Sequence, residues 1–284
     1  MTDVAPRVAF VTGTTHGIGA VTARELARAG YVVAMGCRDV ARGDAVRARI
    51  VEATGSTDVH VLRLDLADAT SIRACAAELL ARFAALHLLV NNAGMMSAKR
   101  ELTADGQESM FATNHLGPYL LTRLLLDRLT TSAPARIVNV ASRAHSRATL
   151  DLDDLPLARG FSAFAAYGRS KLANVLFTRA LARRLAGSGV TVNCLHPGVV
   201  ATNIVPSNSP ILHFLAPLAK PFMLSEERGA KTTLALALDP TLDGVSGAYF
   251  DEDAKQQQPS PIAREDALGE RLWRISAELT RLPA

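Results

Sequence analysis

Residues 7–19, with the sequence RVAFVTGTTHGIG, decide the fold of the chain. A short apolar run over 8–12 leads directly into the glycine-rich turn 13–19, and residues 20–30 (AVTARELARAG) continue with helical periodicity. Glycines let a backbone approach an anion closely, and a helix N-terminus presents free N–H groups to it. The spacing is TGxxxGxG rather than GxGxxG. Such a turn can be purely structural, but the strand before it and the helix after it favour a site for a dinucleotide's pyrophosphate.

The same alternation of strand and helix continues along the chain. Short runs rich in Val, Ile and Leu alternate with longer segments of helical period, which predicts βαβ units. We expect a Rossmann-type, doubly wound parallel α/β sheet of about seven strands, with helices on both faces, in a single domain spanning 1–284. The strands are expected at 8–12, 32–35, 59–64, 88–91, 137–140, 190–194 and 248–250. Gly30 is expected to end the first helix, and Asp68 to cap the helix that follows the third strand.

Composition narrows the class of protein. Hydrophobic residues make up 49% and charged residues 20%, which excludes disordered and fibrous chains. The net charge is +4, but the arginines are scattered through the expected helices, which favours solvated helix faces over nucleic-acid binding. Cys37, Cys75 and Cys194 show neither CxxC nor metal-ligand spacing, so we expect no metal site and a reducing compartment, the cytoplasm.

The sequence also predicts neither a targeting signal nor a membrane-spanning segment. No charged region followed by an apolar one precedes Arg7, so the sequence shows no signal peptide. No apolar run approaches the ~20 residues that cross a bilayer. The longest candidate, 211–224, is interrupted by Pro217 and Pro221.

The end of the second strand distinguishes between two dinucleotides. An acidic residue there binds the ribose 2′-OH of NAD, whereas an arginine accommodates the 2′-phosphate of NADP. The chain has Cys37-Arg38-Asp39, so both readings compete. Because helical periodicity continues directly after Asp39, we interpret Asp39 as a helix N-cap and Arg38 as the phosphate ligand. This predicts a preference for NADP(H) over NAD(H).

Later in the chain, three residues together suggest a site of proton transfer. Tyr167 and Lys171 are four positions apart in an expected helix, which places them one turn apart on one face. A cation near a phenol favours its phenolate, so we expect Lys171 to lower the pKa of Tyr167. Ser142 follows the fifth strand, where its hydroxyl can donate to a substrate carbonyl oxygen. Singly, each residue has a structural explanation, such as an exposed side chain or a helix cap.

Together with the glycine turn, these motifs resemble the short-chain dehydrogenase/reductase family over essentially the whole chain. The chain has the family's ordered motifs Gly13/Gly17/Gly19, Asp65-Leu66, Asn91-Asn92-Ala93-Gly94, Asn114, Ser142, Tyr167/Lys171 and Pro197-Gly198 to Thr202. NHLGPYLLT around Asn114, the CRD triplet, the C-terminal segment and the 25-position interval from Ser142 to Tyr167 resemble the retinol dehydrogenase-like branch. That branch generally prefers NADP(H) and often takes lipophilic carbonyl compounds.

The resemblance implies a role for each residue of the site. Asp65 is expected at the adenine amino group, Asn91 and Gly94 at the ribose, Lys171 at the nicotinamide ribose hydroxyls and Thr202 at the carboxamide. Asn114 is expected to hold a water in a proton relay to Lys171, although NNAG is equally a turn and Asn114 a helix kink. The catalytic set is Asn114, Ser142, Tyr167 and Lys171. The cofactor set is Gly13, Thr15, His16, Gly17, Ile18, Gly19, Arg38, Asp65, Leu66, Asn91, Ala93, Gly94, Tyr167, Lys171, Pro197, Gly198, Val200 and Thr202. His16 replaces a small polar residue and is either near the phosphates or merely exposed.

The implied activity is hydride transfer between NADP(H) and a carbonyl or alcohol carbon of a lipophilic small molecule. Two alternatives use the same scaffold: reduction of an activated C=C bond, dehydration or epimerisation, and a dinucleotide-binding regulatory protein. Residues 202–225, rich in apolar side chains, are expected to form a substrate lid, or else short packed helices, a subunit contact or a membrane-surface contact. A homodimer or homotetramer is the expected assembly.

Overall fold

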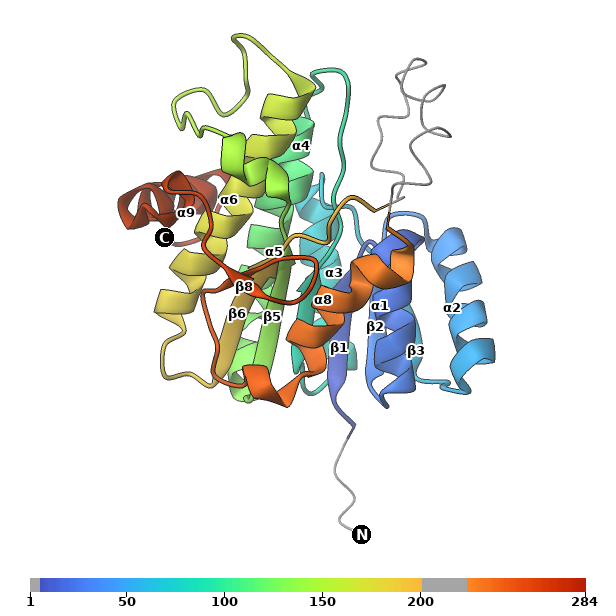
Figure 1. Ribbon diagram of the computed structural model, residues 1–284. Coiled ribbons are helices and arrows are strands. Elements are labelled where there is room, and N and C mark those ends of the chain that lie inside the picture. The colour runs from blue at the N-terminus through green and yellow to red at the C-terminus, as the bar shows by residue number, and fades with distance from the viewer. Residues whose placement is uncertain (1–5, 201–223) are drawn as a thin grey trace.

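A computed structural model describes residues 6–200 and 224–284 of the chain, which form a mostly parallel sheet between layers of helices (Figure 1). The expected lid, 202–225, lies almost entirely outside the described residues. The strands of the sheet are β1 (Val8–Thr12), β2 (Val32–Cys37), β3 (Val59–Arg63), β4 (Leu88–Asn91), β5 (Ala135–Val140), β6 (Val190–Leu195), β7 (Tyr249–Phe250) and β8 (Gln256–Gln257). The α-helices of the described residues are α1 (Gly17–Arg28), α2 (Val40–Thr54), α3 (Ala69–Arg82), α4 (Ser109–Phe111), α5 (Gly117–Thr131), α6 (Ala163–Arg184), α8 (Glu226–Leu238) and α9 (Asp266–Leu279).

The strand order is β3-β2-β1-β4-β5-β6-β7-β8. Strands β1 to β7 pair in parallel, and β8 pairs antiparallel with β7. The doubly wound α/β fold predicted from the sequence is therefore confirmed, but the described sheet has eight strands rather than seven. The direction of winding reverses between β1 and β4, and ligands of such sheets bind beside the carboxyl ends of the strands at this point.

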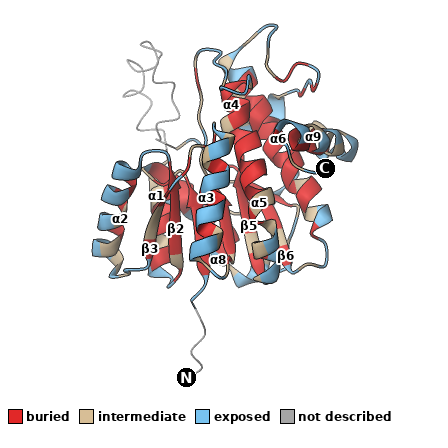
Figure 2. Cartoon of the chain, turned by 180° about the vertical axis from the view of Figure 1, so that it is seen from behind, coloured by how far each residue is buried: buried red, intermediate tan, exposed pale blue. Residues whose placement is uncertain are grey.

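The helices cover both faces of the sheet, as predicted. One apolar core joins the sheet to α3, α5 and α6, and a second joins it to α1, α2 and α8. Figure 2 shows the central strands buried and the outer sides of α2 and α3 exposed. The central strands β1 and β4 are buried along their whole length because neither face of the sheet meets water there.

Helix ends follow the capping residues expected from the sequence. Asp39 accepts a hydrogen bond from the Arg42 backbone N–H at the start of α2, and Asp68 accepts one from Thr70 N–H at the start of α3. Gly30 follows α1 with φ of 84°, a left-handed conformation that glycine adopts at low cost. The two aspartate caps begin α2 and α3 beyond the carboxyl ends of β2 and β3, whereas Gly30 lies at the opposite edge of the sheet.

Helix α9 lies against α6 on the outside of the molecule (Figure 1). Its Trp273 is almost fully buried and packs against the rings of Tyr119 from α5 and Phe177 from α6. The guanidinium groups of Arg123 and Arg184 lie 4.9 and 4.0 Å from the Trp273 ring. A late segment of the chain therefore completes the packing of two central helices.

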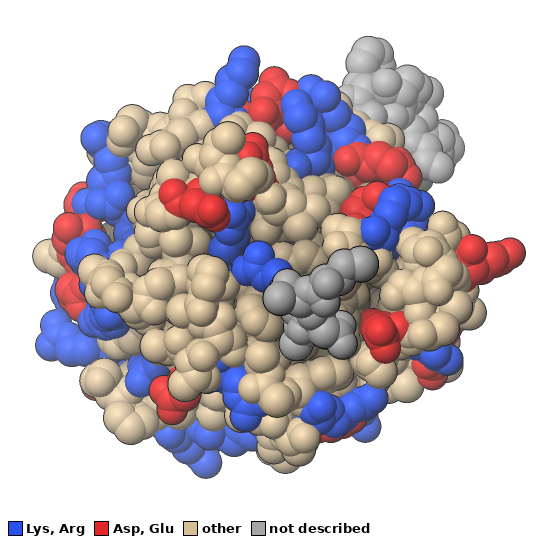
Figure 3. All heavy atoms as spheres, turned by 90° about the horizontal axis from the view of Figure 1, so that it is seen from below, with Lys and Arg blue, Asp and Glu red and all other residues tan. Residues whose placement is uncertain are grey.

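The charged residues of the surface are mixed in sign. In the view from below the sheet, Figure 3 shows Lys and Arg interspersed with Asp and Glu around the face. Many of them form ion pairs along or between helices, such as Arg82 with Glu78 at 3.0 Å. Among the described helices, none is long and apolar enough to cross a membrane.

Candidate active site

A cavity of about 900 Å³ opens at the carboxyl ends of the strands, where the change in winding predicts a ligand. Most of the residues that the sequence assigns to a dinucleotide line it. They are Gly13, Thr15, His16, Gly17, Ile18, Gly19, Arg38, Asp65, Leu66, Ala93, Gly94, Tyr167, Lys171, Pro197, Gly198 and Val200, together with Ser142. Thr202 lies outside the described residues.

The glycine turn forms a cradle at one end of this cavity. Gly13 and Gly17 have φ of 72° and 64°. A Cβ at Gly19 would lie 2.2 Å from the Gly13 carbonyl oxygen and 2.5 Å from Asn92 Nδ2, so only glycine fits there. The start of α1 therefore packs tightly against the turn that follows β1, and its first residues, Gly17 to Gly19, line the cavity. A helix N-terminus at this place presents backbone N–H groups to an anion, which fits a pyrophosphate.

Two side chains that the sequence analysis did not assign hold this cradle. Asn92 Nδ2 donates to the carbonyl oxygens of Thr12 at 2.8 Å and of Gly13 at 3.2 Å. Thr12 Oγ1 accepts from the backbone N–H groups of Asn92 and Ala93. Both residues belong to motifs that the sequence shows, but pattern alone does not reveal which side chain turns back toward the first strand.

His16 and Thr15 stand at the entrance of α1. His16 is the residue before the helix, is exposed, and its Nδ1 lies 3.0 Å from Thr15 Oγ1. Because the His16 side chain lines the cavity beside Gly17, it is placed near the cradle and is exposed as well. The two readings left open by the sequence are compatible.

At the end of β2, Arg38 and Asp39 have different surroundings. Arg38 lines the cavity. The Asp39 carboxylate caps α2 through Arg42 N–H and also lies 3.2 Å from Arg42 Nε. The carboxylate that would bind a 2′-OH is therefore engaged with its own helix.

The next two motifs divide between cavity and core. Asp65 lines the cavity, and its Oδ1 accepts from Ala67 N–H at 3.0 Å. Asn91 instead points into the protein, where its Nδ2 donates to Thr122 Oγ1 at 3.0 Å and to Asn139 Oδ1 at 2.8 Å. Its described contacts link β4 to β5 and α5, and Asn91 is not among the residues that line the cavity.

Tyr167 and Lys171 face the cavity from the first half of α6. Lys171 Nζ lies 5.7 Å from the centre of the Tyr167 ring and donates to the Val140 carbonyl oxygen at 2.8 Å. Burial lowers the pKa of Lys171 to about 8. Burial also raises the pKa of Tyr167, and a hydrogen bond with the Ser142 side chain partly offsets this. The direction differs from the lowered tyrosine pKa expected from the spacing, because the desolvation of the phenol dominates.

Ser142 lies between Tyr167 and the end of β5. Its Oγ accepts from the Ala144 N–H at 3.2 Å, so it caps the short 3-10 turn η2 (Arg143–Arg147). Ser142 lines the cavity together with Tyr167, and its side chain lowers the pKa of the Tyr167 phenol. Ser142 can therefore cap η2 and also present its hydroxyl to a substrate in the cavity. A carbonyl oxygen placed between these two hydroxyls would meet two donors.

Asn114 lies in a single π-helical turn, η1 (Ala112–Leu116), between α4 and α5. Its amide is fully buried, accepts from Met95 N–H at 2.8 Å, and donates to Met95 O at 2.9 Å and Ser170 Oγ at 3.0 Å. A Cβ at Gly94 would lie 3.2 Å from Lys171 Nζ and 3.5 Å from Asn114 Oδ1. The irregular turn thus brings Asn114 toward Lys171, as π-bulges often do at functional sites.

Apolar side chains surround the opening of the cavity. Leu102, Phe164 and Val199 line it and remain 49%, 75% and 68% exposed. Large exposed apolar side chains that line a cavity are typical of a surface that binds an apolar partner. Met95 and Met96 continue the apolar lining inward.

Comparison with known proteins agrees with this geometry. The family model described as short chain dehydrogenase matches residues 7–210. Retinol dehydrogenase 12 of Mus musculus is 47% identical over 273 residues, covering 96% of this chain and 86% of that protein. A crystal structure of an uncharacterised protein from Mycobacterium paratuberculosis superposes with a TM-score of 0.77 at 36% identity, covering 98% of this chain and 95% of the other. A blue fluorescent protein from a metagenomic library, solved with NADPH, gives a TM-score of 0.67 at 27% identity, covering 86% and 95%.

The fold, the glycine cradle and the Ser142, Tyr167 and Lys171 group define an oxidoreductase that uses a nicotinamide dinucleotide. The chain belongs to the short-chain dehydrogenase/reductase family. Within that family it is retinol dehydrogenase-like, as its motifs suggested.

Proposed function

We propose that the protein is an NADP(H)-dependent reductase and dehydrogenase that interconverts a carbonyl and an alcohol on a lipophilic small molecule. The observation that carries this proposal is the meeting of Ser142, Tyr167 and Lys171 with the glycine cradle and Arg38 in one cavity. The cradle, Asp65, Lys171 and Pro197-Gly198 would hold the dinucleotide. When bound, its nicotinamide supplies the hydride for reduction or accepts it in oxidation.

The proton of the reaction belongs to Tyr167. In reduction the phenol O–H gives its proton to the substrate oxygen, whose C=O π bond becomes a C–O–H group as the carbon gains the hydride. Ser142 donates a hydrogen bond to the same oxygen and stabilises the negative charge that develops on it. Lys171 stabilises the phenolate that remains, and Asn114 lies on the route by which a proton returns from solvent. Oxidation follows the same path in reverse.

The preference for NADP(H) rests on the different surroundings of Arg38 and Asp39. Arg38 lines the cavity, whereas the carboxylate of Asp39 is engaged with α2 and Arg42. A guanidinium binds a phosphate through paired, charge-assisted hydrogen bonds, and it has no comparable preference for a hydroxyl.

The proposed substrate class rests on the apolar opening formed by Leu102, Phe164 and Val199. The retinol dehydrogenase relatives, named for a lipophilic alcohol, support the same class. An apolar substrate gains about 25 cal/mol for each Å² that it buries there. We also propose that the protein acts in the cytoplasm.

The test is NADPH consumption, followed by absorbance, with all-trans-retinal, aliphatic aldehydes, aromatic ketones and polycyclic ketones. Replacing Tyr167 with Phe removes the proton donor and retains the ring, so turnover should fall by about 100-fold or more while NADPH still binds. NADPH binding is measured separately by fluorescence titration. Turnover by Tyr167→Phe at the wild-type rate would contradict the assignment.

Product analysis separates this proposal from the other reactions possible on the scaffold. With deuterated NADPH, reduction of a carbonyl places the label on the carbon that bears the new hydroxyl. Label on the carbon of a former C=C bond would instead indicate reduction of an activated alkene. A protein that binds NADPH and consumes none with any of these compounds would indicate a regulatory role.

A further inference from the structure

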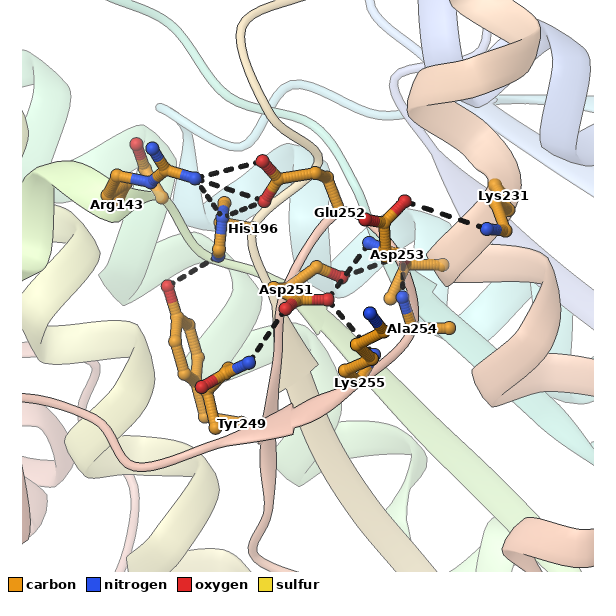
Figure 4. Close-up of polar contacts among 12 residues, drawn as sticks. Arg143, His196, Lys231, Tyr249, Asp251, Glu252, Asp253, Ala254 and Lys255 are labelled. Carbon is orange, nitrogen blue, oxygen red and sulfur yellow. Dashed lines mark hydrogen bonds and ion pairs between the residues drawn. The ribbon is translucent and has the colours of Figure 1, made fainter.

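A cluster of polar side chains lies behind the active site, between the ends of β5, β6 and β7. Figure 4 shows Tyr249 in contact with His196, and Arg143, His196 and Glu252 in polar contact with one another. We call Arg143, His145, His196, Tyr249 and Glu252 the rear cluster. His145, His196 and Tyr249 are buried, whereas the Arg143 side chain is 70% exposed and that of Glu252 is 29% exposed.

One carboxylate joins two loops in this cluster. Glu252 accepts from Arg143 Nη2 through both oxygens, at 2.9 and 3.1 Å. Its Oε2 also lies 2.5 Å from His196 Nε2. Arg143 directly follows Ser142, and His196 directly precedes Pro197-Gly198. Glu252 thus contacts the neighbours of a substrate-binding serine and of the segment assigned to the nicotinamide end.

The hydrogen bonds of the two histidines define their charge. The Ser260 N–H donates to His145 Nε2 at 3.3 Å, so His145 Nδ1 carries the proton that it shares with the Ser142 carbonyl oxygen at 2.8 Å. Tyr249 OH lies 2.7 Å from His196 Nδ1. Burial raises the pKa of Tyr249 and lowers the pKa of both histidines, which favours a phenol that donates to a neutral His196. His196 Nε2 then faces the Glu252 carboxylate and lies 3.2 Å from Arg143 Nη2.

The ring of Tyr249 packs between the two histidines. Its centre lies 4.8 Å from that of His145 and 5.5 Å from that of His196. His145 holds the backbone of Ser142, and His196 begins the other loop. Packing and hydrogen bonds therefore act in the same direction, holding the two loops against β7.

These contacts act where the backbone ladder of the sheet ends. The last backbone hydrogen bond between β5 and β6 runs from the Ala141 N–H, just after β5, to the Leu195 carbonyl oxygen at 2.8 Å. Beyond it the loops are connected through the rear cluster. A Cβ placed at Gly198 would lie 3.3 Å from Glu252 Cβ, so Glu252 also supports the backbone of the second loop directly.

We propose that Glu252 is a positioning residue that fixes Ser142 and Pro197-Gly198 relative to each other through Arg143 and His196. This inference rests on the proposed function, since it assigns the two loops to the substrate oxygen and to the nicotinamide. Neither Glu252 nor His196 touches the reacting atoms. They instead set the distance between Ser142 and Pro197-Gly198, which contact the substrate and the dinucleotide. Errors of about 1 Å in such distances cost roughly 100-fold in rate.

The experiment compares Glu252→Ala with the wild type and with a matched control, Asp253→Ala. Asp253 is the adjacent carboxylate, is similarly accessible, and pairs with Arg228 and Lys231 on α8 instead of the rear cluster. NADPH affinity is measured by fluorescence titration. Turnover of all-trans-retinal, or of the best carbonyl compound of the screen, is expressed per titrated NADPH site, which removes any unfolded fraction from the comparison.

We expect Glu252→Ala to weaken NADPH binding several-fold and to lower turnover per site about 10-fold or more. Glu252→Gln should recover part of both losses, because its amide oxygen still accepts from Arg143. His196→Asn should resemble Glu252→Ala, and Asp253→Ala should stay within about twofold of the wild type in both quantities.

Two results would overturn the inference while leaving the proposed function intact. In the first, Glu252→Ala matches Asp253→Ala in both quantities. In the second, Glu252→Ala alters only one of them, since a carboxylate that joins the two loops must affect both. A wild-type protein that neither binds NADPH nor reduces a carbonyl compound would contradict the proposed function, and the inference with it.

Discussion

Arg38 and Asp39 are neighbours with opposite charges, and the proposed choice of dinucleotide depends on the first. Replacing Arg38 with Ala should raise KM for NADPH about 10- to 100-fold, because charge-assisted hydrogen bonds contribute about 1.5–3 kcal/mol. KM for NADH should change little. Arg49→Ala is the matched control, because it removes an exposed guanidinium from the same helix, α2, without altering the contacts of Asp39. An unchanged ratio of NADPH to NADH use in Arg38→Ala would reject Arg38 as the discriminating residue.

The raised pKa of Tyr167 gives the two directions of the reaction opposite dependences on pH. Reduction needs the protonated phenol, which a raised pKa preserves through the neutral range, so its initial rate should stay level and fall only at alkaline pH. Oxidation needs the phenolate, so its initial rate should rise with pH over the same alkaline range. Initial rates in both directions between about pH 6 and 10 test this. An oxidation rate that is already level at pH 7 would show a tyrosine pKa below neutrality.

The position of a site residue was predictable from sequence where a motif fixes the local backbone. The orientation and pKa of a side chain were less predictable, because they depend on contacts with distant segments. The spacing of Tyr167 and Lys171 places both in the cavity, as expected. The sign of the tyrosine pKa shift was not predictable, because it depends on how completely other segments cover the phenol. The same holds for Asn91 and Asn92, adjacent in sequence, of which one turns into the sheet and the other toward the glycine cradle.

Among the elements, the π-helical turn η1 carries a buried histidine whose protonation opposes folding. Burial lowers the pKa of His115 to about 4 from the ordinary value near 6.5. Between these values the unfolded chain binds a proton that the folded protein does not, so the free energy of unfolding decreases as pH falls through this window. The loss should reach about 2–3 kcal/mol at pH 4.5.

Urea unfolding of wild type and His115→Gln at pH 7.5 and 4.5 measures this loss. Gln cannot take up the proton, and its amide keeps a polar group near Ser276 Oγ, which lies 2.9 Å from His115 Nε2. The variant should be less stable at pH 7.5 but should lose less stability on acidification. Equal losses in both proteins would mean that other groups, such as carboxylates, account for the whole effect.

Regular elements were predicted closely because their signals are local. Strand β4 has the expected limits, and the caps at Asp39 and Asp68 begin their helices as predicted. Strand β8 was missed, because two exposed glutamines carry no apolar alternation and pair only since β7 lies beside them. The π-helical turn was expected only as an alternative, a helix kink at Asn114, and its π-helical form was not predicted, since its side chains follow the same pattern as an α-helix.

At the scale of the whole molecule, the docking of α9 is the packing feature most open to a test. Trp273→Ala should lower the free energy of unfolding by about 3–5 kcal/mol, because it leaves a cavity among Tyr119, Phe177 and two guanidinium groups. Trp273→Phe should lose clearly less. Arg274→Ala, on the exposed side of the same helix, should change stability by about 0.5 kcal/mol or less. Chemical denaturation measures all three, and a Trp273→Ala variant as stable as Arg274→Ala would contradict this packing.

The position of α9 also has a consequence for the order in which the protein matures. Helices α5 and α6 leave the ribosome long before the segment that covers them, so Tyr119 and Phe177 present an apolar face to solvent during synthesis. Exposed faces of this kind make nascent chains prone to association and dependent on chaperones. The glycine cradle belongs to β1 and α1, whereas Tyr249 and Glu252, which hold the loops opposite it, follow β6 in the chain and are translated after it. The nascent chain therefore contains its nucleotide-binding turn early and gains a fully supported reaction centre only after β7 has been synthesised.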